Sequence, residues 1–308
     1  MSFRMTRRDL VFGSAMAYLG TGLTPSSTEA TEPEDPTVGR ALVFEDRFET
    51  LDWSIWNAGP KPTASDTGFY GRSAFARSVG EEGVNPYSIV DDSDATGGKA
   101  LQISATFVGR AMDVPSYYGN VHPEFQWISG NIQTARRDGT IITGWRRGYL
   151  EARMLFPKHP LTWPAFWLMN GRSILQPQTS IEIDVVEHKG WELTTYGTYL
   201  HEWGQPGEHH EGTGVQTPLD VTQAYHRYGV LITDTDCTPY FERRPVIDTK
   251  TGMPAKWTIT RSAEMNENKD VFWPLLTLAL RTDVPFPQPL RGEDASTHMR
   301  VDYFQVYA

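Results

Sequence analysis

Short stretches of alternating apolar and polar residues dominate the chain from about Ala41 onward. Gly, Pro, Asn and Asp separate them, and no long apolar stripe recurs at helical spacing. This pattern is typical of strands that bury one face, so we expect an all-β fold, a two-sheet β-sandwich. The clearest strand candidates are residues 99–107, 148–156, 180–187, 195–203, 226–233, 271–280 and 299–307.

The second of these candidates shows how the two faces are expected to differ. Leu150, Ala152 and Met154 share one face, which we expect to be core. Glu151 and Arg153 share the other face, which we expect to be polar. The regions 59–98 and 205–218 are rich in Gly, Pro and Ser, and they predict surface loops.

Composition narrows the classes of partner. The chain has 308 residues, 39% of them hydrophobic, which is enough for one large core. Its net charge of −10 disfavours nucleic acid and anionic membranes as partners. The single cysteine, Cys237, excludes an internal disulfide and a zinc-cysteine cluster. We expect a monomer whose partner is neutral or weakly charged.

The first 30 residues are expected to be an export signal. The segment from Thr6 to Val11 contains Arg7 and Arg8 and is similar to the twin-arginine motif. The apolar run that follows is too short to span a bilayer, and the small residues near Ala30 suit cleavage. We therefore expect a signal peptide over 1–30, a disordered linker over 31–40 and one catalytic domain over 41–308. The expected location is periplasmic or extracellular; the alternative is a chance Arg pair in an uncleaved anchor.

Three carboxylates within six residues form the main candidate site. In an extended strand Glu182 and Asp184 point the same way, while the intervening apolar residues point into the core. Glu187 is out of step by one residue. A β-bulge at Val185 or Val186 would bring Glu187 back to the face of the other acids.

Like charges at this spacing raise one another's pKa, which is what cleavage of a glycosidic bond requires. One carboxylate stays ionised as the nucleophile while its partner keeps a proton as the general acid. Glu182 and Glu187 would form the pair, roughly 5 to 6 Å apart as in a retaining enzyme, and Asp184 would hydrogen-bond Glu182. The alternative is a solvated edge strand with chance acids.

The sequence from Glu182 to Glu187 resembles the signature of glycoside hydrolase family 16, in the bulged form of laminarinases, agarases and related endo-glycanases. Four further segments match the family, so the resemblance covers about 41–308. These segments are residues 44–48 followed by Trp56, and residues 148–154, 163–168 and 299–307.

The resemblance implies a concanavalin-like β-jelly roll with a concave cleft. It also implies Glu182 as nucleophile, Glu187 as acid/base and Asp184 as the assisting carboxylate. We expect a secreted retaining endo-glycosidase, with β-1,3-glucan ahead of β-1,3-1,4-glucan, a galactan or an exopolysaccharide as substrate. The alternatives are a transglycosylase on the same fold and a non-catalytic glycan-binding lectin.

Aromatic residues near the acids are candidates for binding sugar, because sugar rings present flat patches of C–H groups. The candidate substrate-binding residues are Trp163, Trp167, His201, Trp203 and Arg153. For the first two the alternative is a core tryptophan, and for His201 it is an ordinary surface histidine.

No catalytic cofactor is expected. His201, Glu208, His209 and His210 lack the spacing of a helical zinc motif, so catalytic zinc is disfavoured. The resemblance implies a structural calcium ion on the convex side, with Asp302 as one ligand.

Overall fold

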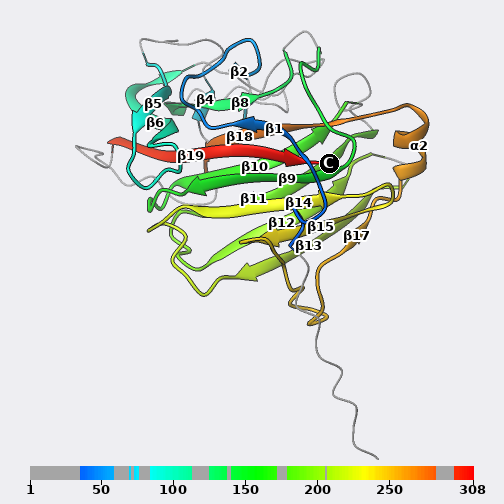
Figure 1. The fold of residues 1–308 in the computed structure, drawn as a ribbon. Coiled ribbons are helices and arrows are strands. Elements are labelled where there is room, and N and C mark those ends of the chain that lie inside the picture. The colour runs from blue at the N-terminus through cyan, green and yellow to red at the C-terminus, as the bar shows by residue number, and fades with distance from the viewer. Residues whose placement is uncertain are drawn as a thin grey trace, which may run out of the picture. The chain divides into compact units, whose positions relative to one another are not determined.

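Two sheets, almost wholly antiparallel, make up the computed structural model (Figure 1). The structure describes residues 35–58, 69–70, 73–75, 84–112, 125–136, 140–171, 179–204, 207–281 and 295–308. The proposed signal, residues 31–34 of the linker and parts of both predicted loop regions lie outside these residues. The division into signal, linker and domain therefore stays a prediction.

Sheet A is the larger of the two sheets and contains twelve strands. They are β1 (Leu42–Asp46), β3 (Phe69–Tyr70), β4 (Ser73–Phe75), β5 (Tyr87–Asp91), β6 (Lys99–Met112), β7 (Phe125–Ser129), β9 (Gly148–Leu155), β14 (His226–Ile232), β15 (Asp236–Phe241), β16 (Arg244–Pro245), β17 (Trp257–Thr258) and β19 (Ser296–Tyr307). Their order is β16-β15-β14-β9-β19-β6-β7-β4-β3, with β1, β17 and β5 paired to β19, β15 and β6.

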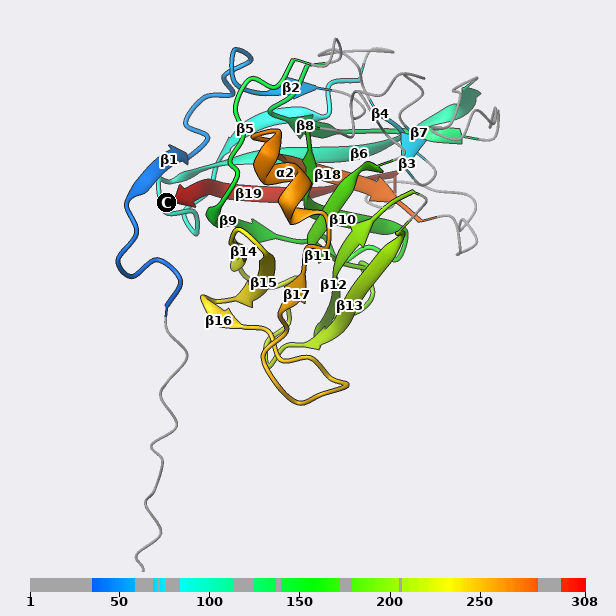
Figure 2. The ribbon, with the colours of Figure 1, turned by 90° about the vertical axis from the view of Figure 1, so that its right-hand side faces the viewer.

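Sheet B has seven strands. They are β2 (Asn57–Ala58), β8 (Asn131–Gln133), β10 (Thr162–Asn170), β11 (Ile181–Glu187), β12 (Thr195–Glu202), β13 (His209–Gln216) and β18 (Phe272–Leu280). Their order is β13-β12-β11-β10-β18-β8-β2, and Figure 2 shows β10 to β13 side by side. A short helix, α2 (Ser262–Glu267), precedes β18. Within the described part of the chain, no helix is long and apolar enough to cross a membrane.

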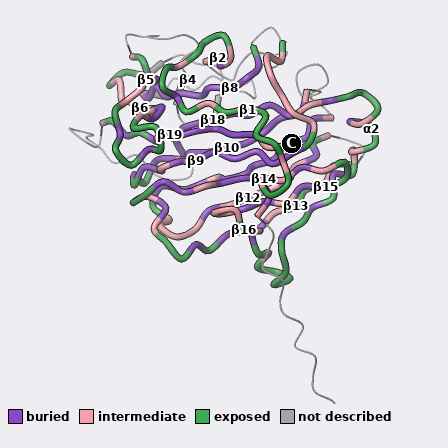
Figure 3. Tube along the Cα trace, in the orientation of Figure 1, coloured by how far each residue is buried: buried purple, intermediate pink, exposed green. Residues whose placement is uncertain are grey.

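The core lies between the two sheets. Leu150, Ala152 and Met154 of β9 pack in one buried cluster with Phe166 of β10 and Ile183 of β11. The strands at the centre of each sheet are buried along most of their length (Figure 3). The predicted all-β sandwich is confirmed, and so is the predicted core face of β9.

The predicted polar face of β9 is polar but not exposed. Glu151 is fully buried, and it accepts hydrogen bonds from the hydroxyls of Tyr149 (2.7 Å) and Tyr303 (2.9 Å). Arg243 donates two more, at 3.1 and 3.0 Å. Side chains from neighbouring strands therefore cover this face of sheet A, which one strand's alternation does not reveal.

Two loop predictions are wrong in part. The region 205–218 contains β13, which pairs with β12 over its whole length at the edge of sheet B. The region 59–98 contains β5 and the two short strands β3 and β4. Glycine content hid β13, because its strand conformation comes from pairing with β12 rather than from its own β-propensity.

Candidate active site

A β-bulge in β11 places the three acids on one face. On the neighbouring strand β10, Asp184 pairs with Trp167 and Val186 pairs with Phe166, which leaves Val185 between them as the extra residue. Val185 and Val186 are both buried in the core. The strand resumes its alternation after them, so Glu187 returns to the outer face of sheet B. The predicted bulge is confirmed.

Glu187 sits where a carboxyl group keeps its proton. Burial, followed by the charges of Asp184 and Glu182, raises its pKa from 4.5 to about 8. The positive charge of His201 and a hydrogen bond with Trp163 act in the opposite direction and are weaker. Glu187 is therefore protonated at neutral pH, as a general acid must be.

Glu182 is held by a tryptophan. The indole N–H of Trp203 donates to Glu182 Oε2 at 3.0 Å. Trp203 is 38% exposed, so one part of the ring anchors the acid while the rest faces solvent. This hydrogen bond fixes the position of the carboxylate that is predicted to be the nucleophile.

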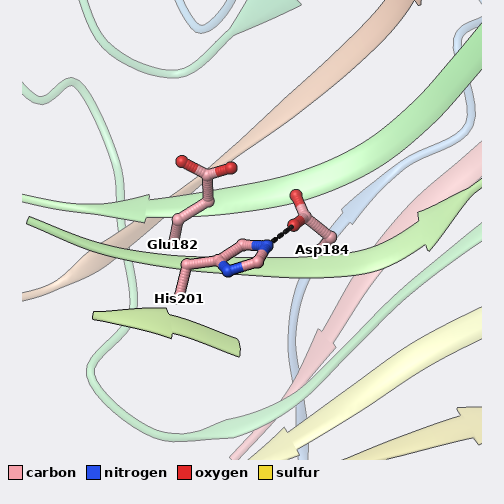
Figure 4. A group of neighbouring side chains, drawn as sticks. All are labelled: Glu182, Asp184 and His201. Atoms are coloured by element: carbon pink, nitrogen blue, oxygen red, sulfur yellow. Dashed lines mark ion pairs between the residues drawn. The ribbon is translucent and has the colours of Figure 1, made fainter. Parts of the chain in front are cut away.

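Asp184 lies deeper, at 3% exposure, and its charged partner is His201. His201 Nε2 lies 3.3 Å from Asp184 Oδ2, and Figure 4 shows the ring on the neighbouring strand turned toward this carboxylate. The predicted hydrogen bond between Asp184 and Glu182 and the predicted separation of Glu182 from Glu187 stay predictions.

Three rings follow one another along the outer face of β12. His201 stacks on Tyr199 with 5.7 Å between ring centroids and on Trp203 with 5.0 Å. The alternation of β12 predicts this common face. The row gives the acids an aromatic border of the kind that sugar rings pack against.

A cavity of about 470 Å³ opens beside Glu187. Trp163 and Tyr199 belong to its wall, as do residues of β12, of β13 and of the turn after β11. Trp163 is partly exposed at the outer face, in contact with Glu187. Its predicted role in binding substrate stays a prediction that this position supports.

Trp167 has a different environment from Trp163. It is only 5% exposed and packs with Met169 and Trp273 in a second apolar cluster. Its indole N–H donates to Thr277 Oγ1 at 2.8 Å. Of the two tryptophans, Trp167 thus has the environment of a packed residue.

Arg153 and Asp302 lie apart from the acids. Both belong to sheet A, where Arg153 forms an ion pair with the buried Asp302 and lies over the ring of Tyr225. Arg153 is on the face of β9 that points away from the core, whereas the acids are on sheet B. The sequence prediction that groups it with the substrate-binding residues does not match this position.

The surroundings of Asp302 do not fit a calcium ion. Its two carboxylate oxygens accept hydrogen bonds from the Thr96 backbone N–H at 2.9 Å, the Thr96 hydroxyl at 2.7 Å and the Arg153 guanidinium. A guanidinium beside the carboxylate opposes a second cation there.

The histidine-rich segment divides between two environments. His209 pairs with the buried Glu202 at 3.0 Å and with Glu211 at 3.3 Å, whereas His210 contacts His201. Of the four candidates for zinc, His209 therefore lies apart, and the other three contact one another in a row from Glu208 through His210 to His201. Glu182, Asp184 and His201 offer atoms within 4.8 Å of one another, but these residues already contact Trp203 or each other, so we assign them to acid chemistry.

Sequence reasoning missed the contact between His210 and His201. Each residue is the register partner of the other across β12 and β13, so their side chains share the outer face. The sequence contains one indication of this contact, because Glu208 and His210 are two residues apart and would point the same way in a strand. The prediction of a loop over 205–218 prevented that interpretation.

Comparisons with known proteins agree with this geometry. Residues 129–261, which include the acids and the row of rings, match the family model described as Glycosyl hydrolases family 16. The endo-1,3-1,4-beta-glycanase EglC of Rhizobium meliloti (strain 1021) is 29% identical over 167 residues, which are 52% of this chain and 30% of that protein. The beta-1,3-glucan-binding protein of Penaeus monodon is 27% identical over 191 residues, or 58% of this chain and 51% of that protein.

Among solved structures, the catalytic domain of an endo-1,3-beta-glucanase (laminarinase) from Thermotoga petrophila RKU-1 has the same fold. The TM-score is 0.59 at 20% identity, covering 87% of this chain and 98% of that one. The match to EglC, by contrast, spans 30% of that protein's length.

Proposed function

We propose that this chain is a member of glycosyl hydrolase family 16, whose model matches residues 129–261, and a retaining endo-hydrolase of a glucan that contains β-1,3 bonds. The observation that carries the proposal is Glu187, whose pKa of about 8 keeps a proton beside two further acids. A site with one protonated and one ionised carboxyl group matches the needs of double displacement.

The first step is cleavage of the glycosidic bond. A Glu182 oxygen forms a bond to the anomeric carbon as the bond from that carbon to the glycosidic oxygen breaks. Glu187 gives its proton to the departing oxygen, so the leaving chain departs as an alcohol and Glu187 becomes a carboxylate.

The second step releases the sugar from Glu182. The Glu187 carboxylate takes a proton from a water molecule, whose oxygen attacks the anomeric carbon. The bond to Glu182 breaks, and both side chains return to their starting protonation states. Two displacements at one carbon restore its original configuration, so the mechanism retains the anomer.

The aromatic border supports a carbohydrate substrate. Tyr199 and Trp203 present ring surface next to the acids, where the C–H faces of glucose units can pack. The named activities of the relatives favour β-1,3 and mixed β-1,3-1,4 bonds over other linkages. We further propose that the protein is exported as a monomer by the twin-arginine route, which the residues Arg7 and Arg8 support.

The test is release of reducing ends from a β-1,3-glucan, a β-1,3-1,4-glucan, cellulose and a galactan. We expect cleavage of the first two, with internal cutting seen as a rapid fall in polymer size. Glu182→Gln and Glu187→Gln should each lose activity by at least about a thousandfold while keeping the fold. Glu264→Gln in α2 is the matched control; unchanged activity in either active-site variant would contradict the proposal.

Two other functions remain distinguishable by product. A transglycosylase would give chains longer than the substrate. A glucan-binding protein without activity is the class named for the Penaeus monodon relative. Such a protein would migrate more slowly in a gel that contains the glucan and would release no reducing ends.

A further inference from the structure

We propose that His210 and Glu208 are positioning residues that keep one additional proton on a pair of histidines beside Asp184. The pair is His201 and His210, which face each other across β12 and β13. The proposed role in catalysis rests on the hydrolase function above. The presence of the additional proton on the histidine pair does not depend on that function.

Four side chains form an unbroken chain of contacts. Glu208 Oε1 lies 2.9 Å from His210 Nε2, and His210 Nδ1 lies 2.9 Å from His201 Nδ1. At the other end, His201 Nε2 lies 3.3 Å from Asp184 Oδ2. All four ring nitrogens of the two histidines therefore face an electronegative atom of this chain.

Counting protons fixes the charge of the pair. Two of the three contacts are hydrogen bonds, and each requires one hydrogen between its two electronegative atoms. The third, between His201 Nε2 and Asp184 Oδ2, is an ion pair, and it requires a hydrogen on Nε2 because the ring is charged only when protonated. Two ionised carboxylates supply none, and two neutral imidazoles supply only one each. The third contact is therefore made only when the histidine pair holds a third proton, which gives it one net positive charge.

The surroundings favour that charge. Trp203, which is not ionisable, packs against both rings, with 5.0 Å to His201 and 4.8 Å to His210 between centroids. Arg261 is the nearby cation, and its guanidinium is occupied by the carbonyls of Trp203, Gly204 and Gly207. The ionisable groups facing the pair from adjacent elements are Glu182, Asp184 and Glu187 on β11, Tyr199 on β12 and Glu208 before β13.

A shared proton gives the site two properties. It keeps an N–H of His201 aimed at Asp184, and it places a positive charge next to the carboxylates that surround the anomeric carbon. When the proton is lost at high pH, one contact is left with two lone pairs and no hydrogen. His201 is then no longer fixed against Asp184.

The direct test counts protonated ring nitrogens by NMR of the full chain labelled with nitrogen-15 in histidine. In the pH range of activity, the His201–His210 pair should show three protonated nitrogens out of four. His209→Gln and His210→Gln assign the signals. Two protonated nitrogens in the pair would overturn the inference, as would a change of the pattern after removal of metals with EDTA.

Kinetics then tests the positioning role. His210→Gln should lower kcat by about tenfold with little change in KM. Because the positive charge of His201 lowers the pKa of Glu187, loss of the shared proton should also move the alkaline limb of activity to higher pH. Glu208→Gln, whose amide oxygen can still accept from His210, should lie between this variant and wild type. The matched control is His209→Gln on the same strand, which should leave both parameters unchanged.

The outcomes separate the two proposals. Three protonated nitrogens in a protein that cleaves no glycan would remove the proposed function and leave the proton count intact. Identical kinetics for His210→Gln and His209→Gln would overturn the positioning role even if the hydrolase function holds.

Discussion

At the scale of single residues, the site depends on unequal environments for three similar acids. The pKa of Glu187 is raised to about 8, mainly by burial and then by the charges of Asp184 and Glu182. Glu182 instead accepts an indole N–H and is half-buried. The sequence predicts which acids pair, but the order of their protonation depends on side chains from β10 and β12.

The Glu187–Trp163 contact gives a prediction with a definite sign. The hydrogen bond with Trp163 lowers the pKa of Glu187, so Trp163→Phe should raise that pKa and keep the acid protonated to higher pH. The alkaline limb of kcat, expected near pH 8 in the wild type, should therefore move upward. Trp53→Phe is a control at an exposed tryptophan; a limb that stays in place or moves downward contradicts the assignment.

At the scale of elements, the bulge could be predicted because the residues that indicate it all belong to β11. Glu187 is one residue out of phase, and two successive valines occupy the step. Strand β13 could not be predicted in the same way, since its register is set by β12. The same limit separates Trp163 from Trp167, because the second ring is buried by side chains of other elements, among them Ala135 and Trp273.

Gly212 on β13 provides the prediction at this scale. A Cβ atom at Gly212 would lie 2.2 Å from Tyr199 Cδ1, whereas one at Gly214 meets nothing within 4 Å. Gly212→Ala should displace the Tyr199 ring and lower the free energy of unfolding by about 1 to 3 kcal/mol. Gly214→Ala, two residues along the same strand, is the control. Equal stability of the two variants in urea denaturation would show that Tyr199 does not occupy this position.

At the scale of the whole molecule, strand β19 joins parts of sheet A that are far apart in the sequence. It pairs with β1, β6 and β9, so the first and last predicted strands meet within sheet A. The outer face of sheet A is less predictable, since the ion pair of Arg153 with Asp302 joins distant parts of the chain. The substrate is not predictable either, because the cavity beside Glu187 is lined by residues from several strands and turns.

The free energy of unfolding should depend on pH because of Glu187. Its folded-state pKa of about 8 lies above the ordinary 4.5, so the folded state binds more protons than the unfolded state between these values. This contribution is present in full at low pH, and stability falls as pH rises through the window. One pKa unit corresponds to about 1.4 kcal/mol, so the full effect is at most a few kcal/mol.

Glu187→Gln removes the titrating group, so the Tm of the variant minus the Tm of the wild type should increase from pH 5 to pH 9. Differential scanning calorimetry at the two pH values measures this, with Glu264→Gln as the control. A Tm difference that is constant across the range, or that shrinks toward pH 9, would show that Glu187 is not held protonated.

The central claim is that Glu182 and Glu187 carry out a double displacement on a β-glucan. Proton NMR of the anomeric signals during the first minutes of cleavage tests it most directly. The account predicts that the β-anomer of the new reducing end appears first and that the α-anomer follows by mutarotation. Initial appearance of the α-anomer would mean a single displacement by water, and it would contradict the role of Glu182 as nucleophile.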